Sequence, residues 1–387
     1  MTNPKLRFKL ANGTAFPDWN KKQLAAVLSV KHGRDYKGLP VGTIPVLGTG
    51  GKITYVDRAL CDWPCALIGR KGTINKPQYM DVPFWSVDTL FYTKPVKNNN
   101  PKFQYYLFQT IDWLKYNEAS GVPSLSASTI EHIQKYIPVD QEQQKIADFF
   151  SALDEKIALA ERKLSALQTL KSGLMQKIFN REIRFKREDG SNFPDWAEVK
   201  MSTMFNSIRN GFVGTIAPFY TTKETGVRYL QGTNIHDGVI SDDVEYYVTQ
   251  EFNQAHRKNI LKEDDILMVQ SGHVGDCAVV GRYAGSNCHA LIVMSNANSQ
   301  KYSSDFVCYY FHSSKGRKNI SLLEKGNTVK HVLASDVAKL QMLLPTIEEQ
   351  KKVVSVLRQM DAKQALARQE LNSLILQKQA FLQQMFV

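Results

Sequence analysis

The chain has 387 residues, of which 43% are hydrophobic and 22% are charged, which excludes a disordered or fibrous protein and suggests two or three domains. It carries 49 Lys and Arg against 37 Asp and Glu, and the resulting net charge of +12 favours a polyanionic partner such as nucleic acid. The sequence has no apolar run long enough for a membrane span, no signal-peptide core near its start and only five cysteines, so we expect a cytoplasmic location and no membrane contact.

The chain opens with a motif that returns in its second half. Residues 6–19 and 183–196 share Arg-Phe-Lys, a Gly and Phe-Pro-Asp-Trp at a constant offset of 177. Residues 138–179 align without a gap with residues 345–386 at an offset of 207. The chain therefore consists of two copies of one unit, and the middle of the first copy is about 30 residues shorter. Two copies are too few for a solenoid, so we expect a pseudo-two-fold arrangement.

The first middle, from about residue 20 to 137, mixes short β-rich runs with Gly and Pro turns. The pattern predicts a strand over 43–47 before a Gly-rich turn, and a helix over 102–113. In the segment 67–74 a strand-like run ends in polar residues around a Gly, which permits positive φ. This segment is either a plain turn between strands or a turn whose side chains meet phosphates and base edges. The candidate DNA-binding residues of this half are Thr49, Lys52, Arg70, Lys71, Thr73 and Lys76.

The block 138–182 predicts a central long helix. Its apolar residues alternate in steps of four and three, a 3.5-residue period that is typical of coiled coils, and the block 345–387 repeats the spacing. Lys171 and Lys378 interrupt the two patterns at the same heptad. Each helix either packs on its own domain or pairs with the other helix, antiparallel if the pseudo-two-fold holds. The predicted seam consists of Ile146, Phe150, Leu153, Ile157, Leu164, Leu167, Leu174, Val353, Leu357, Met360, Leu371, Leu374 and Phe381.

The ends of the two blocks carry two further expectations. Asp140 with Gln143, and Thr346 with Glu349, resemble capping boxes, although the two pairs are one position out of register. The apolar residues between 381 and 386 suggest an exposed end of the seam that would favour aggregation of the isolated chain.

The second middle is less basic than the first. Residues 193–344 contain 15 basic and 15 acidic residues, whereas residues 16–137 contain 15 and 9, so the second half could bind DNA only through a local cluster of charge. The segment 267–274 resembles 67–74, with an apolar run followed by polar residues around a Gly. The candidate DNA-binding residues of this half are Gln231, Asn234, Gln270, Ser271, His273 and Lys330.

Several catalytic and metal-binding patterns are absent from the sequence. There is no Asn/Asp-Pro-Pro-aromatic tetrad for methyl transfer and no phosphate-binding loop ending in Gly-Lys-Ser/Thr. Cys61 and Cys65 lack a second Cys/His pair at zinc spacing. His273 and His289 flank Cys277 and Cys288, but nothing else in the sequence supports a metal site or a Cys/His dyad there. We therefore expect no catalytic residue, no metal and no cofactor in this chain.

These features together resemble the specificity subunit of type I restriction–modification enzymes. The resemblance rests on the duplicated Phe-Pro-Asp-Trp motif, the duplicated Pro-x3-Glu-Gln helix start and the long helix that closes each half. It implies that each middle reads one half of a split site in double-stranded DNA, and that an antiparallel coiled coil sets the gap between the halves. It also implies a chain without catalytic activity. Two modification subunits would methylate adenine with S-adenosylmethionine, and two restriction subunits would supply the ATP- and Mg-dependent nuclease and translocase.

The predicted fold is α+β, with two α/β target recognition domains related by pseudo-two-fold symmetry and separated by two long helices that form an antiparallel coiled coil. The expected domains are residues 1–137 and 183–344 for target recognition, 138–182 for the central helix and 345–387 for the C-terminal helix. The alternative is a coiled-coil scaffold or adaptor without direct DNA readout.

Overall fold

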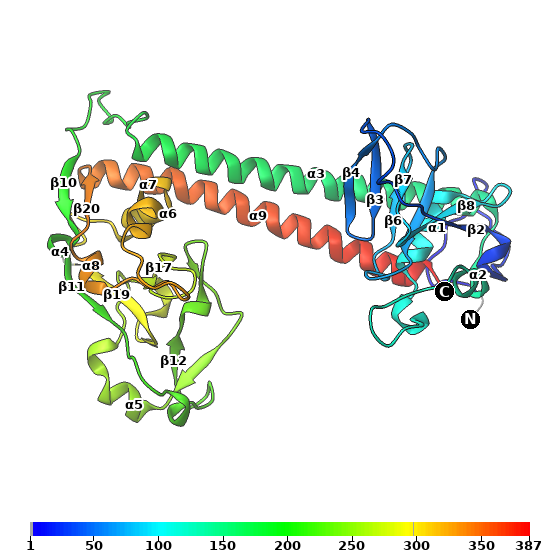
Figure 1. Ribbon diagram of the computed structural model, residues 1–387. Coiled ribbons are helices and arrows are strands. Elements are labelled where there is room, and N and C mark those ends of the chain that lie inside the picture. The colour runs from blue at the N-terminus through cyan, green and yellow to red at the C-terminus, as the bar shows by residue number, and fades with distance from the viewer. Residues whose placement is uncertain (1–2, 297) are drawn as a thin grey trace. The chain divides into compact units, whose positions relative to one another are not determined.

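The computed structural model of the chain describes residues 3–296 and 298–387. The chain divides into two compact units, unit 1 with Met1–Lys163 and Ala367–Val387, and unit 2 with Leu164–Leu366. Two long helices, α3 (Asp140–Phe179) and α9 (Ile347–Met385), each contribute one end to each unit (Figure 1). Among the described residues, no helix is both long and apolar enough to cross a membrane.

Unit 1 is built on an antiparallel sheet with the strand order β2-β8-β5-β6. A second sheet has the order β4-β3-β7, in which β3 and β7 are parallel. The pair β1–β9 brings the start and the end of the domain together. The elements before α3 are β1 Asn20–Gln23, η1 Leu24–Ala26, β2 Leu28–His32, β3 Ile44–Gly48, β4 Gly51–Val56, β5 Cys65–Gly69, β6 Gln78–Met80, β7 Trp85–Ser86, β8 Leu90–Pro95, α1 Pro101–Gln109, η2 Trp113–Tyr116, α2 Ala127–His132 and β9 Gln134–Ile137.

Unit 2 repeats this topology. Its antiparallel sheet has the order β11-β19-β16-β17, its second sheet has the order β15-β12-β18 with β12 and β18 parallel, and β10 pairs with β20. The elements between the long helices are β10 Ala197–Lys200, α4 Met201–Met204, β11 Phe205–Asn210, η3 Ala217–Phe219, β12 Val227–Leu230, η4 Gly232–Asn234, β13 Ile235–His236, β14 Val239–Ile240, β15 Tyr246–Val248, α5 Gln250–Ala255, η5 Arg257–Asn259, β16 Ile266–Val269, β17 Cys277–Val279, η6 Gly281–Tyr283, β18 Asn287–Cys288, β19 Leu291–Asn296, α6 Ser304–His312, α7 Ser314–Ser321, α8 Ala334–Val337 and β20 Gln341–Leu344.

The segment between the entry motif and the long helix is longer in unit 2 than in unit 1, mainly because of two insertions. β3 and β4 are joined directly by a short turn, whereas their counterparts β12 and β15 are separated by η4 and the hairpin β13–β14. A second addition, α5 with η5, lies between β15 and β16. The two additions leave the sheet topology unchanged because both lie in connections between strands, where insertions are tolerated.

The repeated entry motif is explained by a buried carboxylate. Glu142 of α3 is fully buried and accepts hydrogen bonds from Arg7 Nε (3.0 Å to Oε1), from the Arg7 terminal nitrogen (2.7 Å to Oε2) and from Trp19 Nε1 (3.0 Å). The hydrogen bond to Glu142 raises the pKa of Arg7, so the guanidinium stays charged. The same Arg7 nitrogen also donates to the carbonyl oxygen of Pro17 at 2.7 Å. Glu142 thus connects Arg7 and Trp19 of the entry motif to the start of α3.

Unit 2 contains the same arrangement. Glu349 of α9 is fully buried and accepts from Arg184 Nε (2.7 Å) and from Trp196 Nε1 (3.3 Å), and Arg184 donates to the carbonyl oxygen of Pro194 at 2.7 Å. The Arg, Pro, Trp and Glu of the two repeats therefore have the same structural role.

The capping boxes expected at the helix starts are wrong. The Gln143 amide donates to the carbonyl oxygen of Pro138 (3.1 Å), and its side-chain oxygen accepts from the backbone N–H of Asn100 (3.0 Å). Glu349, the other proposed box residue, is held by Arg184 and Trp196. The Glu-Gln pair is repeated because it fixes the helix start to neighbouring segments rather than because it caps the helix.

The long helices run antiparallel and pack on each other within each unit. None of the predicted seam residues in α3 and α9 is exposed. The seam lysines also have a defined partner. In unit 1, Lys378 pairs with Asp154 at 2.7 Å, and Asp154 accepts a 2.8 Å hydrogen bond from the Tyr106 hydroxyl. The equivalent residues of unit 2, Lys171, Asp361 and Tyr309, form the same three-residue network. Burial raises the pKa of both tyrosines, which keeps them neutral donors.

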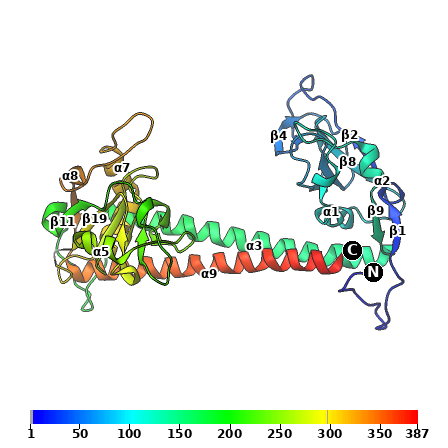
Figure 2. The ribbon, with the colours of Figure 1, turned by 90° about the horizontal axis from the view of Figure 1, so that it is seen from below.

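The last turns of the long helices complete the cores of the domains. Phe386 is buried in unit 1, where its ring stacks on Phe103 at a centroid distance of 5.5 Å, and the backbone N–H of Leu6 donates to the carbonyl oxygen of Gln384 at 3.0 Å. Figure 2 shows this end of α9 beside β1 and β9. Phe179, the counterpart of Phe386 in α3, is buried in unit 2 at 5.4 Å from the ring of Phe306.

This packing corrects the expectation of an exposed apolar end. Met385 and Phe386 belong to the core of unit 1, and Phe381 and Leu382 are partly buried against it. The early seam residues behave similarly, since Ile146 and Phe150 lie in the core of unit 1 and Val353 and Leu357 in that of unit 2. Each helix therefore begins in the core of its own domain and ends in the core of the other repeat's domain.

We predict that Glu142→Gln lowers the free energy of unfolding by about 3–5 kcal/mol, because it leaves the Arg7 guanidinium partly buried beside a neutral amide. Urea denaturation of the full chain measures the loss. Asp18→Asn is the matched control, because Asp18 lies 3.9 Å from the same arginine but 80% of its side chain is exposed, so its loss should stay below about 1 kcal/mol. Equal losses in the two variants would contradict the role given to the buried carboxylate.

We also predict that Phe386→Ala destabilises unit 1 by about 3–5 kcal/mol, and that Phe179→Ala has a similar effect on unit 2, because each change empties a core position. Hydrogen exchange of the full chain, read separately for each unit, locates the loss. Leu376→Ala on α9 is the control, since its side chain is 63% exposed and should change stability by less than about 0.5 kcal/mol. Protection of unit 1 that survives Phe386→Ala would show that the helix end is dispensable.

Candidate nucleic-acid interface

Segments 67–74 and 267–274 occupy equivalent places in the two units. β5 lies between β8 and β6, and β16 lies between β19 and β17. The loops that follow these strands, loop 70–76 and loop 270–276, each contain a Gly at positive φ, Gly72 at 92° and Gly272 at 87°. The weak sequence match therefore reflects a common position in the fold.

A second segment pairs with each loop in the same way. Lys71 forms a bridge with Ser124, and Ser271 forms a bridge with His331. The backbone N–H of Leu125 donates to the carbonyl oxygen of Arg70 at 2.9 Å, and the N–H of Val332 donates to that of Gln270 at 3.0 Å. Each candidate loop is therefore held at its first residues by backbone hydrogen bonds, while its polar side chains are not needed for that support.

Loop 70–76 is the more basic of the two. Arg70, Lys71 and Lys76 are exposed, and Thr73 is half-buried. Arg70 is oriented by a 3.2 Å hydrogen bond from its guanidinium to the carbonyl oxygen of Asp88, which leaves further donors for a ligand. Three positive charges on one exposed loop suit contacts with phosphates or guanine.

Two further candidates of unit 1 come from the hairpin β3–β4. Thr49 lies in the turn, and its hydroxyl is 3.8 Å from the position that a Cβ would take on Gly72, so this turn and loop 70–76 lie together. Lys52 is exposed on β4, where its ammonium group donates to the Tyr55 hydroxyl at 2.7 Å. The structure thus brings Thr49 to the loop and places Lys52 on the strand that follows the turn.

In unit 2 the candidate residues are mostly uncharged. Ser271 and His273 are exposed on loop 270–276, and Gln270 is half-buried at its base. Lys330 is exposed next to the bridged residue His331, and it pairs with Glu324 at 2.7 Å. The loop therefore offers hydrogen-bonding groups rather than the cluster of positive charge present in unit 1.

Gln231 and Asn234 follow β12, the counterpart of β3. Gln231 is half-buried and donates to the Tyr220 hydroxyl at 2.9 Å. Asn234 is fully buried, and its side chain accepts from the backbone N–H of Gln231 (2.9 Å) and donates to the carbonyl oxygen of Val244 (2.7 Å). In the described structure Asn234 therefore supports the connection after β12 and does not face solvent.

The structure adds two residues that sequence reasoning missed. His236 of β13 stacks on His273 at a centroid distance of 5.0 Å, and Asp276 closes loop 270–276 beside them. No local spacing signals this cluster, because His236 and His273 are far apart in the sequence and meet only through the inserted hairpin β13–β14.

Cys277 contacts a different histidine from the ones that flank it in the sequence. Cys277 lies 3.6 Å from His312 rather than beside His273. Burial raises the pKa of the Cys277 thiol, but the Cys308 contact and the charges of His312 and Arg317 outweigh it and lower the pKa to about 6. Cys277 is fully buried, so a substrate cannot reach this sulfur.

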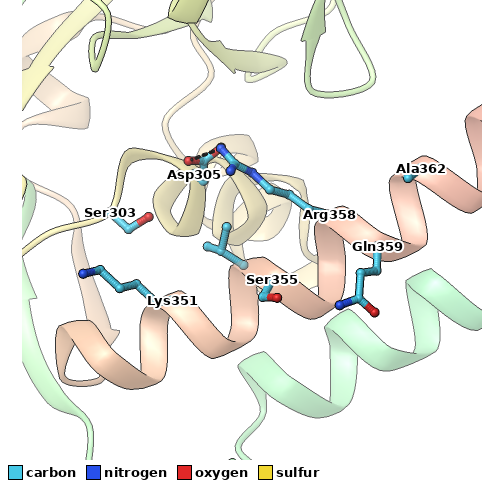
Figure 3. A pocket seen from close by; sticks show the side chains of 8 residues that line it. Ser303, Asp305, Lys351, Ser355, Arg358, Gln359 and Ala362 are labelled. Atoms are coloured by element: carbon cyan, nitrogen blue, oxygen red, sulfur yellow. Dashed lines mark hydrogen bonds and ion pairs between the residues drawn. The ribbon is translucent and has the colours of Figure 1, made fainter.

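A groove on unit 2 lies where the start of α6 meets α9 (Figure 3). Arg358 of α9 crosses it to pair with Asp305 of α6 at 2.8 Å, and the aliphatic part of Val354 forms part of the wall. The other lining residues are Ser303, Lys351, Ser355, Gln359 and Ala362. This lining is a helix surface with one ion pair, without a nucleophile set beside a base.

Similar proteins place this architecture in a known family. The model of the type I restriction modification DNA specificity domain matches residues 17–169 and 194–376, which correspond to the two repeats. The chain is 23% identical over 312 residues to the type I restriction enzyme MjaVIII specificity subunit of Methanocaldococcus jannaschii, covering 76% of this chain and 68% of that protein. It is 26% identical over 294 residues to the putative MjaX specificity subunit of the same organism, covering 70% of this chain and 64% of that protein.

Solved structures agree on the fold. The crystal structure of the type I restriction–modification S subunit from M. genitalium matches with a TM-score of 0.65 at 14% identity, over 100% of this chain and 99% of that chain. A chain from a study of complex assembly and conformational transition of the type I system matches with a TM-score of 0.56 at 16% identity, over 95% and 97% of the two chains. With the family model matched in both repeats, the chain belongs to the type I restriction modification DNA specificity family and is a specificity subunit.

Proposed function

We propose that each unit reads one half of a split site in double-stranded DNA, and that loops 70–76 and 270–276 are the parts that contact it. The observation that carries the proposal is the equivalent placement of these loops in their two units. Each loop follows the corresponding inner strand, β5 or β16, contains a glycine at positive φ and forms a bridge with a corresponding later segment. Phosphate contacts would give affinity and base-edge contacts would give sequence choice.

The catalytic steps would lie on partner subunits. In this proposal two modification subunits methylate adenine with S-adenosylmethionine, and two restriction subunits supply the nuclease and translocase that need ATP and Mg²⁺. This chain would hold none of these cofactors, and it would act in the cytoplasm, where it can reach the chromosome. One structural neighbour comes from work on the assembly of a type I restriction–modification complex, which supports a partnership with other subunits of such a system.

Sequencing of methylated adenines in cells that carry this chain with its modification subunit tests the function. A split methylated sequence that disappears when this chain is deleted is the expected result. Methylation that persists unchanged without the chain would favour the alternative of a scaffold that does not read DNA.

We predict that the double variant Arg70→Ala with Lys71→Ala weakens binding of the modification complex to its target DNA by at least about tenfold. The plot of log affinity against log salt concentration should also become less steep, with the magnitude of its slope reduced by about one to two, because two phosphate contacts are lost. A fluorescence-anisotropy titration over a range of salt concentrations measures both quantities. Lys115→Ala is the matched control, because its side chain is 77% exposed and already pairs with Asp112 at 3.5 Å. An unchanged salt slope in the double variant would remove loop 70–76 from the interface.

We also propose that α3 and α9 together act as a ruler for the gap between half-sites. One heptad adds about 10 Å to a helix, which corresponds to about three base pairs of duplex. Insertion of a heptad into both helices, near Lys163 and near its partner Glu370, should lengthen the methylated spacer by that amount. These two side chains pair at 2.7 Å, so matched insertions there keep the register, whereas an insertion into α3 alone should disrupt the pairing.

The spacer is read by sequencing methylated adenines in cells that carry each variant. A spacer that stays the same after matched insertions would refute the ruler, without affecting the proposal that the loops read DNA.

A further inference from the structure

A compact group of potential metal ligands lies on unit 2. One ring nitrogen each from His236 and His273 and a carboxylate oxygen of Asp276 all lie within 4.8 Å of one another. His236 comes from the hairpin β13–β14, which unit 1 lacks between its corresponding strands, whereas His273 and Asp276 come from loop 270–276. The group therefore joins the inserted hairpin to the loop.

Both imidazoles are held in a tautomer that suits metal binding. His236 Nε2 lies 2.8 Å from the carbonyl oxygen of Thr233, and His273 Nε2 lies 3.1 Å from that of Ile235. A carbonyl oxygen can only accept, so each Nε2 carries a proton, and Nδ1 is the ring nitrogen that can offer a lone pair to a metal ion. Metal-binding histidines in proteins are oriented in this way, by donating the other ring N–H to a backbone carbonyl or a carboxylate.

The carboxylate is also oriented. Arg317 of α7 pairs with Oδ1 of Asp276, so the second oxygen can turn to an ion. Arg317 weakens the attraction for a cation through its own charge, but it also fixes the carboxylate, as second-shell groups do in metal sites. Asp276 is only 16% exposed, which keeps its side chain in place beside the two exposed imidazoles.

We propose that His236, His273 and Asp276 bind a divalent first-row transition-metal ion such as Zn²⁺. Two imidazoles and one carboxylate are a typical set of zinc ligands, with a fourth position left for water. Ligand atoms around tetrahedral zinc are about 3.3 Å apart, so ligand atoms that lie within 4.8 Å of one another need to move closer when the ion binds. The rings of His236 on the hairpin and His273 on the loop are exposed and have room for this movement. The proposal does not depend on the function proposed above.

The position of the ion gives it a physical consequence. Loop 70–76 in unit 1 carries Arg70 and Lys71 where loop 270–276 carries Gln270 and Ser271. A bound divalent cation would bring two positive charges to a loop that has no Lys or Arg, and it would connect that loop to the hairpin β13–β14. The second domain would thus gain a fixed cation where the first uses basic side chains.

Calorimetric titration of the purified, chelator-treated full chain with ZnCl₂ tests the site. We expect one equivalent of saturable binding, and we expect His236→Gln with His273→Gln to weaken it by about 100-fold or more. Asp276→Asn should weaken it by about tenfold. Both histidines are exposed, so the double variant should keep the fold, which circular dichroism checks. Mg²⁺ at the same concentration should not bind, since the site offers nitrogen as well as oxygen ligands.

His331→Gln is the matched control, because His331 bridges Ser271 on the same loop but lies outside the ligand cluster, and it should leave the affinity for Zn²⁺ unchanged. Substitution with Co²⁺ gives a second readout, since a site with histidine ligands produces visible d–d absorption that the double variant should lose. The proposal is overturned if the chain shows no saturable Zn²⁺ binding, or if the double histidine variant binds Zn²⁺ as tightly as the unaltered chain.

Discussion

The structure depends on the exchange of helix ends between the two repeats. Phe179 belongs to the first repeat and fills the core of unit 2, while Phe386 belongs to the second repeat and fills the core of unit 1. Neither domain has a complete core without the far end of the other repeat's helix. Burying a phenylalanine contributes several kilocalories per mole to the free energy of unfolding. The stability of both domains therefore depends on the antiparallel pairing of α3 and α9.

Two polar networks keep this exchange in register. At each helix start a buried glutamate, Glu142 or Glu349, binds the arginine and tryptophan of the entry motif. Further along, Lys378 and Lys171 reach aspartates on the opposite helix, which tyrosines of α1 and α6 also contact. A shift of one helix by a heptad would leave these charges unpaired at partly buried positions, and the cost of an unpaired buried charge selects one register.

Much of the repeated architecture could be predicted, because the same motifs occur twice in the sequence. The duplicated motifs, the heptad pattern and the strand at Ile44–Gly48 follow from periodicity and composition. The exchange of helix ends was not predictable, since apolar residues near 386 look the same whether they end in solvent or in a distant core. Nor did the sequence distinguish Asn234, which is buried, from Gln270 at the base of its loop, because a polar residue after a strand fits either place. The cluster of His236 and His273 could not be predicted for a related reason, because only tertiary contact brings the two rings together.

The division between a repeated frame and divergent loops has a physical basis. Loops 70–76 and 270–276 are held by backbone hydrogen bonds and each contains a glycine at positive φ, so their exposed polar side chains are not needed for that support. Arg70 and Lys71 can therefore be replaced by Gln270 and Ser271 at equivalent positions without a change of topology. The insertion of β13–β14 follows the same logic, because it lengthens a connection and leaves the sheet order intact. A fold of this kind can change the chemistry of its exposed loops while the buried glutamates, the lysine–aspartate pairs and the exchanged phenylalanines keep the two domains assembled.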